Sequence, residues 1–407
     1  MLKRNSYIAL WNDLSSDKSM VFLSGPRQVG KTTLTKEIAS AFSNSVYFNW
    51  DFVKHKQMLI KNPAFFEHLN RKDESAPLVI FDEIHKYKRW KNYLKGIYDQ
   101  FSQNYKFLVS GSGRLDIYQK GGDSLAGRYF QFHLFPFTVA ELSKEKRKFG
   151  EFIKNPLSGF DINHSASTKK IWTRLFRNGG FPEPYLKNSL SFYNKWAVNY
   201  SARLIREDIR SLHNIKDIGN IELLFSLLPS RVGAPVSLNN LAGELQVNFG
   251  SVKKWLNLFE SFYLIFKIAP WTKKISRSIL KEKKIYLFNY PEIEDESSRF
   301  ENMAALELTR AIHYWNEAGR GRFTLHYIRN KEKKEVDFLI ADKNKPVLLI
   351  ETKLNETAPS KNLIDFQNVL NIPAVQLVNK DSVFKIVKNN QNKILIVTAH
   401  QWLSSLP

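Results

Sequence analysis

Residues 25–32 have the types and spacing that phosphate binding requires. The pattern GxxxxGK[ST] directly follows the apolar segment Val21–Leu23, and it is filled by Gly25-Pro26-Arg27-Gln28-Val29-Gly30-Lys31-Thr32. Glycines let such a loop turn its backbone N–H groups toward phosphate oxygens where a helix begins. Lys31 would reach the β- and γ-phosphates, and the Thr32 hydroxyl would coordinate Mg²⁺. We therefore predict a nucleotide site; the alternative is a plain surface turn.

Two carboxylates end a second apolar run. Leu78–Phe81 has the character of a buried strand, and Asp82 and Glu83 follow it directly. Parallel α/β sheets bind ligands at the carboxyl ends of their strands, so both groups are expected beside the phosphates. We predict that Asp82 holds Mg²⁺ through water and that Glu83 orients or deprotonates the attacking water. The alternative is a strand that simply ends in solvent.

Further polar groups end neighbouring strands. Phe107–Val109 leads into Ser110-Gly111-Ser112, which predicts the Ser112 hydroxyl as a sensor of the γ-phosphate. Asp51 follows another strand-like run and is expected to contact the residues that bind the nucleotide rather than the nucleotide itself. A capping role at the strand end is the alternative for both residues.

These residues need a scaffold in which short strands alternate with helices. Between Met20 and Glu141, strand-like runs are each followed by a longer amphipathic stretch, which predicts βαβ units and a parallel sheet. We therefore expect a multidomain α/β protein. Its predicted parts are an ATPase-like core at 1–141, a helical lid or connector at 142–216, a winged-helix-like segment at 217–280 and a small α/β domain at 281–407.

Several motifs in order resemble a family. They are GPRQVGKTT (25–33), VIFDEIHK (79–86), VSGSGRLD (109–116), SLAGRYFQFHLFPFTVAEL (124–142), GGFPEPYL (179–186) and LIREDI (204–209). Together they resemble the prokaryotic AAA-type ATPases that carry a C-terminal domain of unknown function with a restriction-endonuclease-like core. The resemblance implies ATP and Mg²⁺ as ligands, with Thr33 included in the phosphate loop. It also implies that Arg128 is a γ-phosphate or inter-subunit arginine, the latter in a homo-oligomer; an ordinary ion pair is the alternative.

The middle of the chain predicts two short helices joined by a turn. Ser237–Leu245 has one apolar face, and the following stretch places Lys253, Lys254 and Asn257 opposite its apolar residues. An alternating run follows, so the segment resembles a winged helix-turn-helix whose second helix enters the major groove of DNA. Lys253 and Lys254 would then contact phosphates, and Asn257 a base edge or phosphate. A dimerisation or docking module is the alternative.

A hairpin near the C-terminus gathers acidic residues. Glu335–Ile340 and Val347–Lys353 flank the turn-like residues 342–346, and a hairpin centred on Asn344 would place Asp337 opposite Glu351. Two facing carboxylates repel each other unless a divalent cation bridges them. The sequence therefore predicts a metal site in this hairpin.

Asp337, Glu351 and Lys353 also resemble the core of the PD-(D/E)xK nucleases. That resemblance implies that the two acids bind Mg²⁺ and that Lys353 positions the attacking water. Glu301 matches the acid that junction-resolving members place on a preceding helix. Val336 replaces the proline of the family name. A nuclease-like fold kept only for binding and an ordinary edge hairpin both remain open.

Composition limits the classes of function. The chain has 407 residues, enough for roughly two to four domains, and its 43% hydrophobic residues exclude a disordered protein. Its formal net charge of +22 attracts polyanions such as nucleic acid, although it also serves solubility. It contains no cysteine, which excludes disulfides and thiol catalysis. No apolar run is long enough for a signal peptide or a membrane span, so we expect a cytoplasmic protein without a membrane partner.

Together these patterns predict an ATP-hydrolysing enzyme that acts on DNA, with a Mg²⁺-dependent nuclease activity left open. The alternative is a nucleotide-gated switch or remodeller with a protein partner, whose C-terminal domain serves binding or assembly. The salt dependence of DNA binding separates the two.

Overall fold

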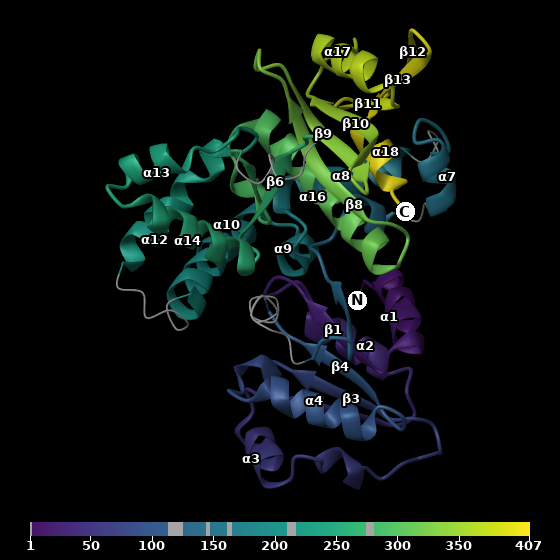
Figure 1. Cartoon of the computed structure of the whole chain (residues 1–407), viewed down its shortest axis with the longest axis vertical. Coiled ribbons are helices and arrows are strands. Elements are labelled where there is room, and N and C mark those ends of the chain that lie inside the picture. The colour runs from purple at the N-terminus through teal and green to yellow at the C-terminus, as the bar shows by residue number, and fades with distance from the viewer. Residues whose placement is uncertain (1, 113–124, 144–146, 161–164, 210–216, 274–280) are drawn as a thin grey trace. The chain divides into compact units, whose positions relative to one another are not determined.

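The computed structural model of the chain describes residues 2–112, 125–143, 147–160, 165–209, 217–273 and 281–407 (Figure 1). It forms two compact units. The first comprises Met1–Phe135 and Ser261–Tyr263, and the second comprises Pro136–Glu260 and Leu264–Pro407. The finer division at residues 142, 217 and 281 stays a prediction. Mixed α/β architecture is confirmed as the fold class.

A parallel sheet of five strands forms the centre of the first unit. The strands are β1 (Met20–Ser24), β2 (Ser45–Asn49), β3 (Leu78–Asp82), β4 (Lys106–Ser110) and β5 (Phe130–His133), in the order β2-β3-β4-β1-β5. The helices of this unit are α1 (Asn5–Asp17), α2 (Lys31–Ala39), α3 (Val53–Lys61) and α4 (Trp90–Phe101). The four strands predicted from their apolar runs are confirmed. The fifth was not predicted from its sequence.

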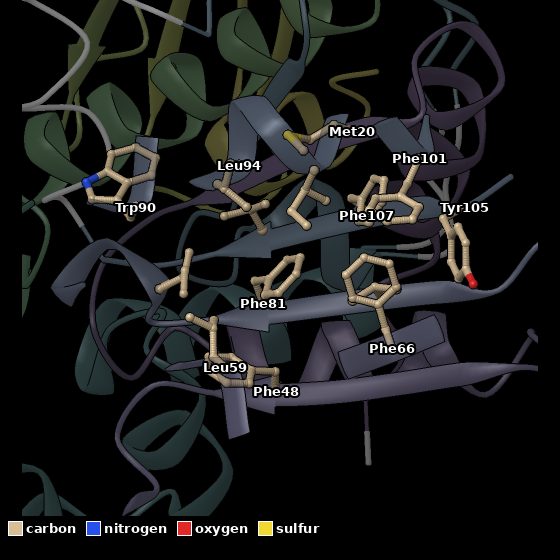
Figure 2. Close-up of a cluster of buried hydrophobic side chains, with 14 of the residues drawn as sticks. Met20, Phe48, Leu59, Phe66, Phe81, Trp90, Leu94, Phe101, Tyr105 and Phe107 are labelled. Carbon is tan, nitrogen blue, oxygen red and sulfur yellow. The ribbon is translucent and has the colours of Figure 1, made fainter. Parts of the chain in front are cut away.

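An aromatic layer holds β2, β3 and β4 together on one face of this sheet (Figure 2). The Phe81 ring packs against Phe48 with ring centroids 5.9 Å apart, and against Phe107 with centroids 6.3 Å apart. Helix α4 covers the layer with buried side chains that include Trp90 and Leu94. Because Phe81 directly precedes Asp82, this packing fixes where the carboxylate at the end of β3 emerges.

The second unit begins with helices. They are α6 (Val139–Leu142), α7 (Phe149–Lys154), α8 (Ser165–Asn178), α9 (Pro182–Lys187), α10 (Leu190–Arg203), the π-helical turn η4 (Leu204–Ile209), α12 (Ile218–Leu227), α13 (Leu238–Glu244) and α14 (Phe249–Ser261). The two short helices predicted in the middle of the chain are confirmed as α13 and α14. Ser237 caps α13 as expected, because its hydroxyl accepts a hydrogen bond from the Asn240 N–H.

An eight-stranded mixed sheet follows. Its strands are β6 (Ile265–Pro270), β7 (Lys284–Leu287), β8 (Phe323–Arg329), β9 (Glu335–Asp342), β10 (Lys345–Lys353), β11 (Ala374–Val378), β12 (Phe384–Asn389) and β13 (Asn392–Thr398). They lie in the order β12-β13-β11-β10-β9-β8-β6-β7, so β12 and β7 form the edges. The helices are α16 (Glu296–Glu317), α17 (Lys361–Leu370) and α18 (Ala399–Ser404). The alternating run after α14 is therefore part of this sheet, because β6 pairs with both β7 and β8.

The β9–β10 hairpin differs slightly from its predicted register. Near the turn Lys345 pairs with Asp342, which centres the hairpin between Lys343 and Asn344 rather than on Asn344. Both of these residues have positive φ, 46° and 66°, as in the type I′ turn that matches strand twist. An irregularity between Pro346 and Leu348 then shifts the register by one residue. The predicted pairing of Leu339 with Leu349 is therefore confirmed beyond it.

None of the helices in the described ranges combines the length and the apolar character that crossing a membrane would need.

Candidate functional site

The phosphate loop joins β1 to α2 and depends on two glycines. Gly25 and Gly30 have φ values of 148° and 96°, at which a residue with a side chain would be strained. A Cβ atom on Gly25 would lie 2.3 Å from the Leu134 carbonyl oxygen, so only glycine fits. The buried Lys31 side chain reaches back over the loop and donates to the Gly25 and Pro26 carbonyls at 2.9 and 2.6 Å. A glycine-containing loop with a lysine ammonium group beside it is suited to binding the phosphates of a nucleotide.

A buried arginine supports this loop from the start of the chain. Arg4 donates to the Val29 carbonyl at 3.2 Å and to the Phe135 carbonyl at 2.7 Å. Its guanidinium also lies 4.8 Å from the centre of the Tyr7 ring. These contacts tie the loop to the residues after β5. Nothing in the local sequence predicted this role, because the partners are 25 and 131 residues away.

Asp82 accepts hydrogen bonds from three hydroxyl groups. Thr32 and Tyr47 donate to its Oδ2 atom at 3.0 and 2.6 Å, and Ser110 donates to Oδ1 at 2.5 Å. The side chain is only 2% exposed, so its charge depends on these donors. Burial and the hydrogen bond to Asp82 raise the pKa of Tyr47, which keeps its hydroxyl protonated. The Thr32 and Asp82 side chains meet as expected, whereas sequence analysis did not predict that Tyr47 and Ser110 donate to Asp82.

Glu83 has a left-handed backbone conformation, which residues other than glycine rarely adopt. Its φ is 56°, and its N–H donates to the Ser110 carbonyl at 2.9 Å. The carboxylate lies 3.1 Å from the Lys86 ammonium, which also pairs with Asp51 at 2.6 Å. Asp51 and Glu83 therefore share one lysine beside the end of β3. The left-handed turn redirects the chain directly after Asp82, so the two adjacent acids have different surroundings.

The remaining predicted residues of this site differ in burial and in their contacts. Ser112 is buried just after β4, as a strand-end hydroxyl should be, whereas residues 113–116 of the VSGSGRLD motif are outside the described ranges. Thr33 is exposed in the first turn of α2. Arg128 forms a two-pronged ion pair with Asp99 of α4, with Nε–Oδ1 and Nη2–Oδ2 distances of 2.6 and 3.1 Å. This contact is the ion pair that was considered as the alternative; a role for Arg128 at the nucleotide stays a prediction.

In the second unit, four carboxylates and two lysines gather around the β9–β10 hairpin. The acids are Glu301 of α16, Glu335 and Asp337 of β9, and Glu351 of β10. The fully buried Lys284 of β7 lies 3.0 Å from the Glu301 carboxylate and 2.6 Å from that of Glu335. The Tyr286 hydroxyl donates to Glu301 at 2.7 Å. We call these groups, together with Thr352 and Lys353, the acidic cluster.

The predicted metal ligands belong to this cluster, but each already has a protein partner. Asp337 accepts from the Thr352 N–H at 2.8 Å and from its hydroxyl at 2.6 Å. Lys353 lies 2.9 Å from Glu351 Oε1. Sequence analysis missed Lys284, although the alternation of Lys284 and Tyr286 along β7 was a usable signal for two polar groups on one face.

Excess negative charge is evident in the acidic cluster. Burial and the nearby Asp337 raise the pKa of Glu301 to about 7 and that of Glu351 to about 8. Burial opposes the charge of Lys284, yet attraction to Glu301, Asp337 and Glu335 raises its pKa. The second oxygen of Glu351, Oε2, is buried without a hydrogen-bond partner. The carboxylates of Glu301, Asp337 and Glu351 do not bring three ligand atoms within 4.8 Å of one another, so metal binding by these described residues stays a prediction.

The predicted DNA-contacting residues lie on α14. Lys253 and Lys254 are exposed, and Asn257 accepts a hydrogen bond from Lys267 of β6 at 2.9 Å. Lys253 and Asn257 line a common pocket, which is not bordered by Lys254. The two neighbouring lysines, which the sequence pattern treated alike, therefore differ in whether they border this pocket.

Comparison with known families supports the assignment of the first unit. Residues 17–143, which contain the phosphate loop and Asp82, match the family described as AAA domain. We refer to residues 17–143, which match this family, as the AAA domain. Residues 169–290 and 297–399 match two families described as domains of unknown function, DUF8612 and DUF4143. The nuclease-like core expected after residue 281 therefore stays a prediction.

Relatives of the whole chain are distant. The uncharacterized protein MJ1544 of Methanocaldococcus jannaschii is 24% identical over 348 residues, which cover 81% of this chain and 74% of the relative. MJ1637 of the same organism is 25% identical over 67% of this chain and 61% of its own length. The uncharacterized protein Rv2008c of Mycobacterium tuberculosis is 21% identical, and the match spans 66% of this chain but only 54% of that protein.

Solved structures show likenesses at low similarity. The Walker-type ATPase PABY2304 of Pyrococcus abyssi is 13% identical, with a TM-score of 0.44 over 74% of this chain and 96% of that chain. The Aeropyrum pernix ORC1 protein in complex with DNA is 10% identical, with a TM-score of 0.31 over 75% of this chain and 93% of that chain.

Proposed function

We propose that the AAA domain binds ATP with Mg²⁺ and hydrolyses it, and that the chain acts on DNA. The observation that carries the first part is the 3.0 Å hydrogen bond between Thr32 and Asp82. It joins the hydroxyl of the phosphate loop, which follows β1, to a buried carboxylate at the end of β3, two strands away in the sheet. A hydroxyl and a carboxylate in this arrangement are the protein groups that hold Mg²⁺ in P-loop nucleotide sites.

Each residue of this site has a proposed role. The backbone N–H groups of residues 25–33, apart from Pro26, which has none, and the Lys31 ammonium bind the phosphates, which neutralises their charge. Mg²⁺, held by Thr32 and Asp82, would stabilise the negative charge of the phosphates when bound. Glu83 orients the attacking water and accepts its proton, while Ser112 contacts the γ-phosphate. Arg128 stabilises charge at the γ-phosphate in its own chain or in a neighbouring copy, which requires its ion pair with Asp99 to open.

Asp82→Asn tests this part of the proposal. The amide keeps the shape of Asp82 but removes the charge that Mg²⁺ needs, so nucleotide affinity should lose its dependence on Mg²⁺. Binding of a fluorescent ATP analogue with and without Mg²⁺ measures this. Asp13→Asn, at a residue of α1 outside the site, is the matched control. Equal Mg²⁺ dependence in the wild type and Asp82→Asn would exclude Asp82 from the site.

Action on DNA is supported by charge and by the arrangement around α14. The net charge is +22, and α14 presents Lys253 and Lys254 to solvent. Helices α13 and α14 are followed by the antiparallel pair β6–β7, which is the order of elements in a winged helix. DNA binding that weakens steeply as salt rises would support contacts to phosphates. Affinity for DNA that is negligible at low salt would favour the nucleotide-gated switch with a protein partner.

A second candidate function is Mg²⁺-dependent cleavage of DNA by the acidic cluster. The buried Glu351 Oε2 atom without a hydrogen-bond partner is the observation that favours it. Asp337, Glu351 and Glu301 would hold the metal, which lowers the pKa of bound water when it is present. Lys353, which lies 2.9 Å from Glu351, would orient the water that attacks a phosphate. Cleavage of plasmid DNA with Mg²⁺ or Mn²⁺, by the wild type and by Glu351→Gln, tests this function.

A further inference from the structure

A pocket of about 550 Å³ lies between the start of α13, one face of α14 and the β6–β7 pair. Its size falls within the roughly 300–1,000 Å³ that is usual for small-ligand sites. Apolar side chains such as Leu256 and Ile285 border it, and hydrogen bonding from the Val236 N–H to the Lys283 carbonyl closes one side. The pocket belongs entirely to the second unit, and its lining residues include neither the phosphate loop nor the acidic cluster.

Positive charge dominates the lining. Lys253, Lys267, Lys281 and Lys283 border the pocket, against the single acid Glu282. Lys267 is held by Asn257 and Glu260, and its side chain is only 11% exposed. Lys253, Lys281 and Lys283 form no ion pair with any carboxylate among the described residues. Three lysines without acidic partners at one opening favour a ligand that carries phosphate.

One wall of the pocket is an exposed aromatic ring. Phe249, in the first turn of α14, is 46% exposed and lines the pocket together with Lys253, four residues later on the same face. An exposed ring beside lysines is the combination that stacks a nucleobase and holds its phosphate. The polar groups of Asn257 and Ser237, which also border the pocket, can hydrogen-bond to a base edge.

We infer that this pocket takes an unpaired nucleotide of a nucleic-acid strand, with its base on Phe249 and its phosphate on Lys253. The inference rests on the proposed action on DNA and adds that the bound nucleotide is unpaired. Base faces in a duplex are covered by their neighbours, so a ring in a pocket gains a stacking partner only from an unpaired base. Lys254, which does not border the pocket, should contribute only general attraction.

Binding of the full chain to two labelled probes tests this inference. The probes are an oligothymidine strand and a duplex, each of about 20 nucleotides in length, which exceeds common single-strand site sizes. Phe249→Ala should weaken binding of the single strand about tenfold, as expected for loss of one stacked base, and leave duplex binding within about twofold. Phe249→Trp should retain single-strand affinity, because the ring is kept.

Matched controls exclude indirect effects. Phe384 of β12 is similarly exposed, at 44%, so Phe384→Ala should leave both affinities unchanged. Lys253→Ala should weaken binding of the single strand more than Lys254→Ala does. The melting temperature should be the same in all these variants as in the wild type, and ATP hydrolysis should be unchanged in Phe384→Ala.

The contrary outcomes are distinct. If the wild type binds both probes and Phe249→Ala weakens neither, or weakens both equally, the pocket does not select unpaired nucleotides and this inference is wrong. The proposed action on DNA would survive either result. If the wild type binds neither probe at low salt, the proposed action on DNA and this inference are both wrong.

Discussion

The Thr32 hydroxyl donates a hydrogen bond of 3.0 Å to Asp82, which links the first turn of α2 to the end of β3. Fifty residues of sequence separate the two groups, and the parallel sheet brings them together. Tyr47 and Ser110 bind the same carboxylate from the strands on either side of β3. Strands β2, β3 and β4 and helix α2 therefore meet at one buried charge.

This arrangement predicts different defects for two variants of the AAA domain. Lys31→Ala should abolish ATP binding, because it removes the charge that faces the phosphates. Glu83→Gln should keep ATP affinity and slow hydrolysis about a hundredfold or more, because an amide cannot accept the proton of the attacking water. Nucleotide affinity and turnover measured on the same preparations decide this. Glu67→Gln, an exposed carboxylate in the same unit, is the control, and unchanged turnover in Glu83→Gln would remove Glu83 from catalysis.

Replacing both exposed lysines of α14 tests their proposed binding to DNA phosphates. Lys253→Ala combined with Lys254→Ala should weaken duplex binding equally across unrelated sequences. The slope of log affinity against log salt should fall by about one unit for each phosphate that the protein no longer neutralises. Titrations at several salt concentrations measure the slope. A double variant with wild-type affinity and slope would favour a docking function for α13 and α14.

The acidic cluster predicts a metal-dependent gain in stability. In a chain that carries Asp82→Asn, to suppress the site in the AAA domain, Mn²⁺ should still raise the melting temperature. Adding Asp337→Asn should remove that gain and leave the metal-free chain equally or more stable, because one of the repelling carboxylates is neutralised.

Lys353→Ala should separate metal binding from DNA cleavage. The variant should retain stabilisation by Mn²⁺ but lose cleavage, because Lys353 is proposed to act on the attacking water rather than on the metal. Calorimetry with Mn²⁺ and a cleavage assay give the two readouts. If no Mn²⁺ binds and neither variant alters cleavage, the nuclease proposal fails and the AAA domain remains.

Stability should decrease between pH 5 and pH 8 because of buried acids such as Glu307. Burial raises the pKa of Glu307 to about 8 from an ordinary value of 4.5, although its carboxylate accepts from the Val139 N–H at 2.7 Å. The folded state therefore holds this proton more tightly than the unfolded state does. Its contribution to stability is complete below about pH 4.5 and is lost as the pH rises to about 8.

Glu307→Gln should make that pH dependence shallower. The amide oxygen can still accept from Val139, and no proton is exchanged on unfolding. Urea denaturation at several pH values measures the slope for the wild type, for Glu307→Gln and for Glu296→Gln, a change at an exposed carboxylate of the same helix. Parallel pH profiles for the wild type and Glu307→Gln would contradict the prediction.

Local patterns were enough to predict the residues of the phosphate loop and the strand that leads to Asp82. Their chemistry depends on close spacing and on apolar runs, and both can be seen within a few residues. The strand β5 was missed because it has only four residues, with polar Gln131 and His133 alternating with phenylalanines. Tyr47 and Arg4 were missed because their partners are distant in sequence, so only the sheet order and the loop's packing reveal them.

Part of the acidic cluster could likewise be predicted from a local pattern. Alternation along two adjacent strands was enough to group Asp337, Glu351 and Lys353. Lys284 comes from the far edge strand β7, and its place beside Glu301 follows from the order of the sheet rather than from local spacing. Alternation along β7 could have marked Lys284 as a polar residue on one face, but its pairing with two of the four acids required the three-dimensional arrangement.

The edge strand β12 has a consequence for colloidal behaviour. Among the described strands β12 pairs with β13 alone, and it exposes Phe384 and Ile386 at 44% and 48%. An edge with exposed apolar side chains invites strand addition by another polypeptide, which is how aggregates begin. Lys385 lies between them in sequence, and Lys388 follows on the same face as Phe384 and Ile386. Their positive charges repel an edge of like charge, so this strand should be less prone to pair with a second copy of the chain than its apolar side chains alone suggest.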